Sequence, residues 1–210
     1  MTDLLPEWVG SMGIVLFGLV VVMTIAVGII IHIRKRKRFD VSKISITDID
    51  QMSGHEFEDY LYVLFVALGY EETFLTKKSR DFGADLLFRD RSRRETVVQA
   101  KRITEKVGLD AVQEIFAAQA YYQADKAVII TTAKKLSEPC MKLAAATKVS
   151  IIARDDLIEM IRCFKRGKVE EAQDLVELSH EEIEYNSDDS LDDVDHQRGF
   201  IKAGDYFYKL

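Results

Sequence analysis

The chain has 210 residues, of which 48% are hydrophobic and 30% are charged, a globular composition that excludes a fibrous or wholly disordered chain. The net charge is −6, but residues 166–210 alone hold thirteen acidic and five basic residues. The acidity therefore belongs to the tail and says nothing about what the middle of the chain binds.

Residues 10–33 form the first predicted element, a transmembrane helix. This segment has no Asp, Glu, Lys or Arg and, at about 1.5 Å per residue, its length of roughly 36 Å crosses a hydrocarbon core of ~30 Å with some tilt. The five basic residues at 34–38 predict a short extracytoplasmic N-terminus at residues 1–9 and a cytoplasmic location for the remainder. A cleaved signal peptide is the alternative, but its basic residues would precede the apolar run.

A basic juxtamembrane segment and a polar linker occupy residues 34–50, and a globular domain is expected at residues 51–165. Ser53 and Glu56 have the spacing of a helix capping box. Apolar residues at helical spacing continue to Leu68, and Gly69 suits the end of a helix. The pattern therefore predicts a first helix that begins just after Ser53.

Short strands and helices are expected to alternate through the rest of the domain. Their order, strand-strand-strand-helix-strand-helix-strand-helix, predicts a mixed sheet with helices on both faces. Strands are predicted at Glu72–Thr76, Ala84–Arg89, Thr96–Lys101, Lys126–Thr131 and Val149–Ile152, and helices at Leu109–Tyr122, from Ser137 to Thr147, and from a cap at Asp155 to Lys165.

The acidic C-terminal tail, residues 166–210, is expected to begin with a short helix at Val169–Leu178. Glu181–Asp195 is rich in acidic and poor in apolar residues, which predicts disorder, and an apolar ending follows. The two cysteines, Cys140 and Cys163, have no His or Cys at metal-ligand spacing, so we expect reduced thiols and neither a disulfide nor a zinc site.

One group of polar residues suggests chemistry: Asp81-Phe82-Gly83-Ala84-Asp85, followed by Gln99-Ala100-Lys101. Gln99 and Lys101 share a strand face because they are two residues apart, and Asp85 joins them if the two strands pair with these faces together. Asp85, Gln99 and the carbonyl of Ala100 are oxygen ligands of the kind that Mg²⁺ prefers, while Lys101 would stabilise developing negative charge. The alternative is that no metal site exists: Gln99 and Lys101 would then lie on a solvated strand face, and residues 81–85 would form an ordinary turn.

The stretch from Met52 to Ile161 resembles the catalytic domain of Mrr-type restriction endonucleases, which belong to the PD-(D/E)xK nuclease superfamily. Four motifs in order carry the resemblance. They are Gly54-His55-Glu56-Phe57-Glu58 opening a helix that ends Leu68-Gly69-Tyr70, then Asp81-Phe82-Gly83-Ala84-Asp85, then Val97-Val98-Gln99-Ala100-Lys101, and last Ala127-Val128-Ile129-Ile130-Thr131-Thr132.

The resemblance implies an α/β fold of the restriction-endonuclease type, a mixed sheet flanked by helices with an α-β-β-β-α-β core, here preceded by one transmembrane helix. It implies Mg²⁺-dependent, type IV-like cleavage of double-stranded DNA, with Asp85 as a metal ligand and Lys101 as the motif lysine. Gln99 takes the second acidic position, where the lost charge should weaken metal binding, and Glu58 joins from the first helix. Phe82 stands where many relatives have Gly, and Asp81 is expected to orient the turn.

Two basic clusters are candidates for phosphate contacts, because both are expected to flank the site. Solvated loop charges are the alternative for each. No module that reads sequence or methylation is visible. The clusters are Lys77, Lys78 and Arg80 before the acidic motif, and Arg91, Arg93 and Arg94 in the hairpin turn.

These observations predict a single-pass protein of a prokaryotic inner or plasma membrane, with a cytoplasmic nuclease domain that acts on double-stranded DNA. A homodimer would suit this function, because one site of this type cuts one strand at a time. The alternative is a weak or inactive nuclease-fold module that binds DNA or a partner at the membrane. For the acidic stretch 181–195, a solubilising tail and a mimic of DNA that restrains cutting are both open.

Overall fold

The computed structural model describes residues 16–31, 40–76, 82–178, 200–203 and 206–209. The chain divides into two units, Met1–Ile49 and Asp50–Leu210. In the first unit, residues 16–31 are helical and every side chain of this helix is exposed. No helix within the described ranges is both long enough and apolar enough to cross a membrane. The span predicted at residues 10–33 extends outside these ranges at both ends, over 10–15 and 32–33.

The linker before the domain is more ordered than its polar composition predicts. It forms a short 3₁₀ helix, η1 (Val41–Lys43), and a short helix, α2 (Ile46–Ile49). Asp40 caps η1 by accepting a hydrogen bond from the N–H of Ser42 at 3.2 Å. Ile44 and Ile49 are buried, which explains why this mostly polar segment folds into short helices.

The second unit is built on a five-stranded sheet in the order β1-β2-β3-β4-β5. β1, β2 and β3 pair antiparallel, whereas β3, β4 and β5 pair parallel, so the predicted mixed sheet is confirmed. The strands are β1 (Thr73–Leu75), β2 (Leu86–Arg89), β3 (Glu95–Lys101), β4 (Lys126–Thr131) and β5 (Ser150–Ile152).

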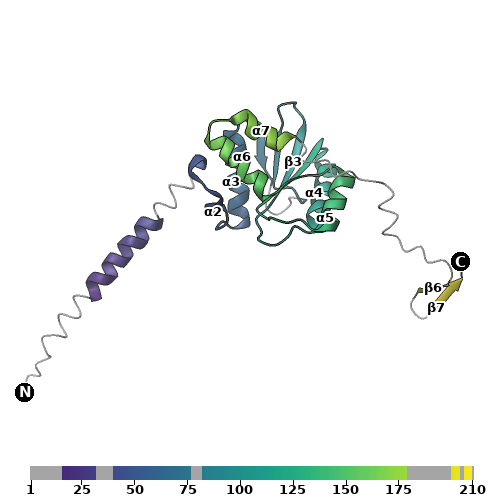
Figure 1. Ribbon diagram of the computed structural model, residues 1–210, viewed down its shortest axis with the longest axis horizontal. Coiled ribbons are helices and arrows are strands. Elements are labelled where there is room, and N and C mark those ends of the chain that lie inside the picture. The colour runs from purple at the N-terminus through teal and green to yellow at the C-terminus, as the bar shows by residue number, and fades with distance from the viewer. Residues whose placement is uncertain (1–15, 32–39, 77–81, 179–199, 204–205, 210) are drawn as a thin grey trace, which may run out of the picture. The chain divides into compact units, whose positions relative to one another are not determined.

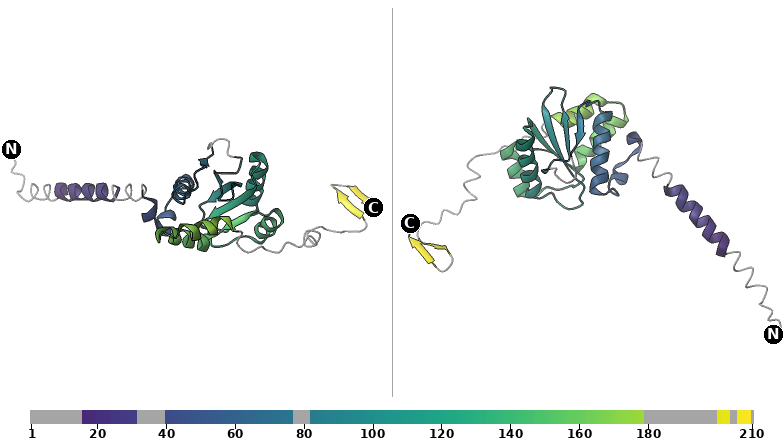
Figure 2. Two further views of the ribbon diagram at one scale, coloured as in Figure 1. Left: turned by 90° about the horizontal axis from the view of Figure 1, so that it is seen from above. Right: turned by 180° about the vertical axis from the view of Figure 1, so that it is seen from behind.

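Helices cover both faces of this sheet, as predicted (Figures 1 and 2). On one face, α4 and α5 enclose an apolar core with β3 and β4 that includes Val97, Ile115 and Ile129. On the other face lie α3 and α6, with α7 packed on α6. The helices are α3 (Gly54–Ala67), α4 (Leu109–Tyr122), α5 (Glu138–Thr147), α6 (Arg154–Lys165) and α7 (Val169–Glu177).

Helix α3 starts and ends where the sequence predicts. Ser53 and Glu56 form the capping box, with the N–H of Ser53 donating to Glu56 at 2.9 Å. Gly69 follows the helix with a φ of +91°, a left-handed conformation that glycine adopts without strain. Phe65 then packs on Phe88 of β2, with ring centroids 4.9 Å apart, which joins α3 to the sheet.

Two details of the later helices differ from expectation. The N-cap of α6 is Ala153, and Asp155 lies inside the first turn, where its negative charge still favours the helix dipole. In α4 the buried face includes Ala118, whereas Phe116, which helical spacing places on one side with Val112 and Ile115, is 47% exposed. Residues 111, 112, 115 and 118 define one side of a 3.6-residue helix, which leaves position 116 outside.

In the tail, the helix predicted at Val169–Leu178 is confirmed as α7. The disorder predicted for 181–195 falls outside the described residues. The apolar ending forms two strands that the sequence did not predict, β6 (Phe200–Ala203) and β7 (Tyr206–Lys209), paired antiparallel in a separate two-stranded sheet. Cys140 and Cys163 are free and buried.

Candidate functional site

Asp85 stands just before β2 and is held against the end of β3. Its N–H donates to the carbonyl of Val98 at 2.8 Å. Its Oδ2 accepts a hydrogen bond from the N–H of Ala100 at 2.7 Å. These two bonds place the Asp85 carboxylate beside the segment that carries Gln99 and Lys101, so the three residues meet at one end of the β2–β3 hairpin.

Gln99 is a buried amide in the middle of this group, only 4% exposed. Its Nε2 donates to Oε2 of Glu114 at 2.6 Å. Its Oε1 is buried and has no hydrogen-bond partner among the described residues. An unpaired buried amide oxygen is unfavourable by about 1–3 kcal/mol. The unpaired oxygen is therefore an unusual feature that a bound cation would resolve.

Glu114 of α4 is a site residue that the sequence analysis missed. Besides Gln99, its Oε2 accepts from Nζ of Lys101 at 2.8 Å, with the Lys101 side chain 27% exposed. Burial alone would raise the pKa of Glu114, but the hydrogen bonds from Lys101 and Gln99 hold that pKa below its ordinary value. In the sequence Glu114 looks like any charge on the outer side of a helix. Only the crossover that lays α4 over β3 reveals its partners.

The conformation and packing of the turn before Asp85 account for the residues found in it. Gly83 has a φ of +93°, and a Cβ there would lie 2.6 Å from the backbone oxygen of Glu114, so both conformation and space require glycine. Phe82 also has a positive φ, 49°, a conformation that is uncommon for a residue other than glycine. Its ring stacks on Tyr121 with centroids 4.0 Å apart. The turn thus packs directly on α4 next to Glu114.

Glu58 lies on α3 with a side chain that is 16% exposed. Its carboxylate contacts Nδ1 of His55 at 3.1 Å, three residues earlier on the same helix. Within the described ranges, no hydrogen bond or ion pair joins Glu58 to Asp85, Gln99 or Lys101. The contacts of the structure therefore do not bring Glu58 into the group, and its role stays a prediction.

Of the two basic clusters, the structure describes only the one in the hairpin turn. Lys77, Lys78 and Arg80, together with Asp81, lie outside the described residues. Arg91, Arg93 and Arg94 lie in the turn that joins β2 to β3, at the end of the hairpin opposite Asp85. The four residues of β2 lie between Asp85 and Asp90, and five steps of about 3.3 Å separate the two ends by roughly 16 Å. The expectation that the turn arginines flank the site was therefore wrong.

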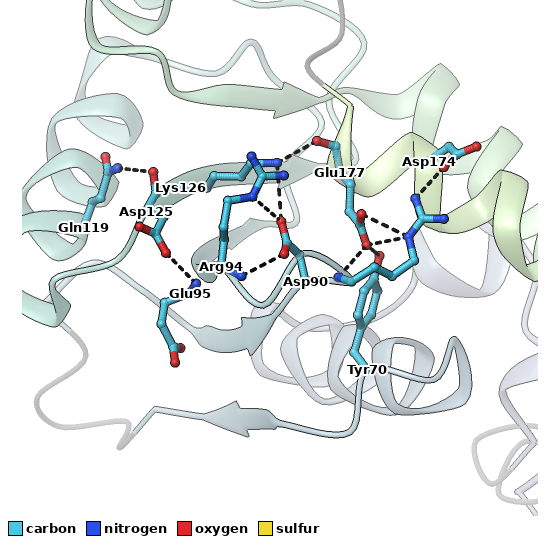
Figure 3. A network of polar contacts seen from close by, with 10 residues as sticks. Tyr70, Asp90, Arg94, Glu95, Gln119, Asp125, Lys126, Asp174 and Glu177 are labelled. Carbon is cyan, nitrogen blue, oxygen red and sulfur yellow. Dashed lines mark hydrogen bonds and ion pairs between the residues drawn. The ribbon is translucent and has the colours of Figure 1, made fainter.

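Two of the three turn arginines, Arg91 and Arg94, instead belong to a structural network, part of which Figure 3 shows. Arg94 donates from Nε to the fully buried carboxylate of Asp90 at 2.9 Å, and Nζ of Lys126 lies 3.6 Å from the same group. Arg91 pairs with Glu177 of α7 at 3.0 Å. This network fastens the hairpin turn to α7, and it engages the guanidinium groups of Arg91 and Arg94 away from the group at Asp85.

The chemistry of the donors at Asp85 suits a hard cation. The described ranges contain no cluster of three or more His, Cys, Asp or Glu side chains that could hold a metal ion. An amide oxygen lies outside that set, however, and the unpaired Oε1 of Gln99 is one. Together with the Asp85 carboxylate it offers two oxygen donors. Mg²⁺ commonly binds proteins through few side chains and keeps several waters.

The chain was also compared with known proteins. No curated protein and no solved structure matches it. A family model described as a restriction endonuclease, the Mrr catalytic domain, matches residues 49–161, which is more than half of the chain. The match runs from the start of the domain into α6 and includes Asp85, Gln99, Lys101 and Glu114. The chain therefore belongs to the Mrr-type restriction endonucleases, with a nuclease domain of the PD-(D/E)xK superfamily.

Proposed function

We propose that this protein is a membrane-anchored, Mg²⁺-dependent endonuclease that hydrolyses phosphodiester bonds in double-stranded DNA, as type IV restriction enzymes do. The observation that carries the proposal is the buried Oε1 of Gln99, which has no partner among the described residues although Asp85 and Lys101 lie beside it. A stable fold gains nothing from such an atom, whereas a cation site needs it.

Each residue of the group has a distinct part in the proposed reaction. Asp85 and Gln99 would hold the cation through carboxylate and amide oxygens, with the carbonyl of Ala100 as a further donor. A bound Mg²⁺ neutralises the phosphate and lowers the pKa of a coordinated water. Lys101, partly exposed at the edge of the group, would place its ammonium against the negative charge that develops on the phosphate oxygens. Glu58 of α3 stays a candidate for an additional carboxylate.

The duplex would lie along the edge of the sheet at which β3 and β4 end. Lys106 is exposed on the loop after β3, and Lys134 and Lys135 are exposed on the loop after β4. The two loops meet through a hydrogen bond from the N–H of Val107 to the carbonyl of Lys135 at 3.0 Å. These lysines share the sheet edge of Lys101 and suit the DNA backbone.

Lys77, Lys78 and Arg80 stay candidates for phosphate contacts, because they precede the acidic turn in the sequence. Arg93 and Arg94 are not part of the proposal, since the turn that holds them is at the far end of β2 and β3. A homodimer would allow two sites to cut both strands of one duplex.

Membrane attachment is the second part of the proposal. It is supported by the uncharged, apolar sequence of residues 10–33, by the basic residues at 34–38, and by the exposure of every side chain on the helix at 16–31. The test is to compare the full chain with a version that starts at residue 48, after cell fractionation and alkaline washing. The full chain should stay with the membranes of a prokaryotic host and the shortened one should not. Release of both by the wash would contradict anchoring.

A non-catalytic module is the second candidate function. It is favoured by one specific observation, the ion pair of Lys101 with Glu114, which engages the motif lysine before any substrate is present. Under this hypothesis the fold binds DNA or a partner at the membrane without cutting. The presence of Asp85, Gln99 and Lys101 together argues against it, because a binding scaffold requires none of them.

Plasmid cleavage by the full chain in detergent separates the two functions. The assay uses Mg²⁺, Mn²⁺ or EDTA, with methylated and unmethylated plasmid. Asp85→Ala and Lys101→Ala are the test variants, and Lys165→Ala, an exposed lysine of α6, is the matched control. Metal-dependent cutting that is lost in both test variants and kept in the control would establish the nuclease. DNA binding by a folded protein that never cuts would favour the non-catalytic module.

A further inference from the structure

One carboxylate oxygen connects the two polar residues of the motif strand. Oε2 of Glu114 accepts from Nε2 of Gln99 at 2.6 Å and from Nζ of Lys101 at 2.8 Å. Gln99 and Lys101 are two residues apart on β3 and so share the face that α4 covers. Glu114 is in no motif of the strand, yet it contacts both side chains on which the proposed chemistry depends.

A glutamine at a cation site has an orientation problem that an aspartate or glutamate lacks. Its amide can turn by 180°, which exchanges the oxygen and the NH₂ group in nearly the same volume. Only one of the two orientations offers oxygen to a cation, whereas the other presents hydrogens. An unguided Gln99 would therefore present its oxygen only part of the time.

Glu114 removes this ambiguity. An ionised carboxylate only accepts hydrogen bonds, so the group of Gln99 that faces it must be the NH₂. The opposite atom, the buried and unpaired Oε1, is then fixed as the donor available to a cation. Oε2 of Glu114, which accepts from Gln99, also accepts from Nζ of Lys101 at 2.8 Å, so two donors converge on the Glu114 carboxylate.

We propose that Glu114 is a positioning residue, which turns the Gln99 amide so that Oε1 is presented to the catalytic cation and holds the Lys101 ammonium beside it. The inference rests on the nuclease function proposed above. It also explains how the site works with a neutral glutamine in an acidic position. Glu114, hydrogen-bonded to the Gln99 amide, supplies the negative charge that Gln99 lacks. This charge polarises the amide and makes Oε1 of Gln99 a better ligand.

Glu114→Gln is the sharpest test, because an amide at 114 can donate to Oε1 of Gln99 as readily as it accepts from Nε2. Binding of Mn²⁺ to the full chain in detergent, followed by electron paramagnetic resonance without DNA, gives a readout besides activity. We expect about a 10-fold loss of Mn²⁺ affinity, a matching rise in the Mg²⁺ concentration for half-maximal cleavage, and an unchanged melting temperature. Gln113→Ala, the exposed neighbour on α4, is the control and should change none of these.

A swap variant guards against a merely structural explanation. Gln99→Glu combined with Glu114→Gln keeps the amide–carboxylate hydrogen bond but moves the charge onto the strand, where it can bind the cation directly. The double variant should recover the Mn²⁺ affinity that Glu114→Gln loses. A structural role for Glu114 would appear instead as a lower melting temperature of Glu114→Gln, which the swap would restore together with the affinity.

The outcomes separate this inference from the function on which it rests. Equal Mn²⁺ affinity in wild type and Glu114→Gln would overturn the positioning role, and so would Mn²⁺ binding by the wild type that does not depend on Asp85. A wild type that binds Mn²⁺ through Asp85 but never cuts DNA would refute the nuclease instead, and the effect of Glu114→Gln on affinity would still decide the positioning role.

Discussion

The N–H of Ala100 donates a hydrogen bond to Oδ2 of Asp85 across 2.7 Å, and this bond joins the acidic turn to the motif strand. The donor sits between Gln99 and Lys101 in the chain, so the carboxylate that would hold the cation is positioned by the backbone of the strand that carries the other two groups. Geometry of this kind does not depend on the length of a flexible side chain.

Asp85→Asn and Asp85→Ala should therefore differ in stability but not in activity. The asparagine keeps an oxygen that can accept from the N–H of Ala100, whereas alanine leaves this donor without its acceptor, which we expect to lower the free energy of unfolding by about 1–2 kcal/mol more. Both should reduce metal-dependent cleavage by about 100-fold or more. Denaturant unfolding and plasmid cleavage measure the two effects, and an active Asp85→Asn protein would contradict the assignment of Asp85 as a metal ligand.

Gly83→Ala should damage the site from a distance. The φ of +93° disfavours alanine, and its Cβ would lie 2.6 Å from the backbone oxygen of Glu114, so the turn must move away from α4. We expect a loss of about 2–3 kcal/mol in the free energy of unfolding, together with weaker cleavage. The control is Gly54→Ala at the start of α3, where nothing lies within 4 Å of the new Cβ. Similar unfolding midpoints for the two variants would contradict the packing of the turn on α4.

The network at the far end of the hairpin should make stability depend on pH through Asp90. Burial would raise the pKa of this carboxyl, but hydrogen bonds and charge from Arg94, with Lys126 nearby, hold the pKa below its ordinary value of 3.8. A lowered pKa in the folded state stabilises the fold above the ordinary value, and the contribution is lost as the pH falls below it. Asp90→Asn should lower the free energy of unfolding by about 3 kcal/mol at pH 7.

This difference from the wild type should shrink as the pH falls below 3.8, because the unfolded wild-type chain then binds a proton at Asp90 that the folded state, with its lower pKa, does not yet bind. Urea unfolding between pH 3 and pH 7 measures it. Asp59→Asn, an exposed carboxyl of α3, is the matched control and should show no comparable change. A constant difference between Asp90→Asn and wild type over this range would show that the charge of Asp90 is not the stabilising factor.

Local patterns in the sequence predict the elements of this fold well, because each depends on neighbours in the chain. The capping box at Ser53 and the two-residue spacing of Gln99 and Lys101 along β3 are examples. Glu114 and Phe116 could not be placed in this way, because their surroundings depend on the angle at which α4 crosses the sheet. The same holds for Arg94, whose buried partner Asp90 looks like ordinary turn composition in the sequence. The site residues on and next to the strands, Asp85, Gln99 and Lys101, could thus be predicted from motifs. Glu114 could not, because its contacts depend on how α4 packs over β3.

The lysines on the loops that follow β3 and β4 should govern the salt dependence of DNA binding. Replacing Lys106, Lys134 and Lys135 by Gln should weaken binding uniformly across sequences and reduce the slope of log K against log salt by about 1 for each phosphate contact removed. Fluorescence anisotropy on an Asp85→Asn background measures binding without cutting. Replacement of Arg93 and Arg94, at the opposite end of the hairpin, should change the slope less. The reverse ranking would place the duplex at the hairpin turn.

The single variant Gln99→Glu should be less stable than the wild type above acidic pH unless a metal ion is bound. The new carboxylate would face Glu114 at the 2.6 Å now spanned by the amide hydrogen bond. Two like charges at this distance raise the pKa of the pair, so the penalty is absent in acid and grows as the pH rises through the raised pKa. We expect the variant to match the wild type near pH 4 and to lose about 1–3 kcal/mol of unfolding free energy at pH 8 without metal.

Magnesium should then recover most of that loss in Gln99→Glu, because a cation between the carboxylates replaces their repulsion by attraction and binds only the folded state. Melting curves at pH 5 and pH 8, with Mg²⁺ or with EDTA, measure the recovery. The swap variant with Glu114→Gln carries one carboxylate and should melt as the wild type does at both pH values. If Mg²⁺ left the melting temperature of Gln99→Glu unchanged at pH 8, position 99 would not face a cation, and the proposed metal site would have to be moved to other residues.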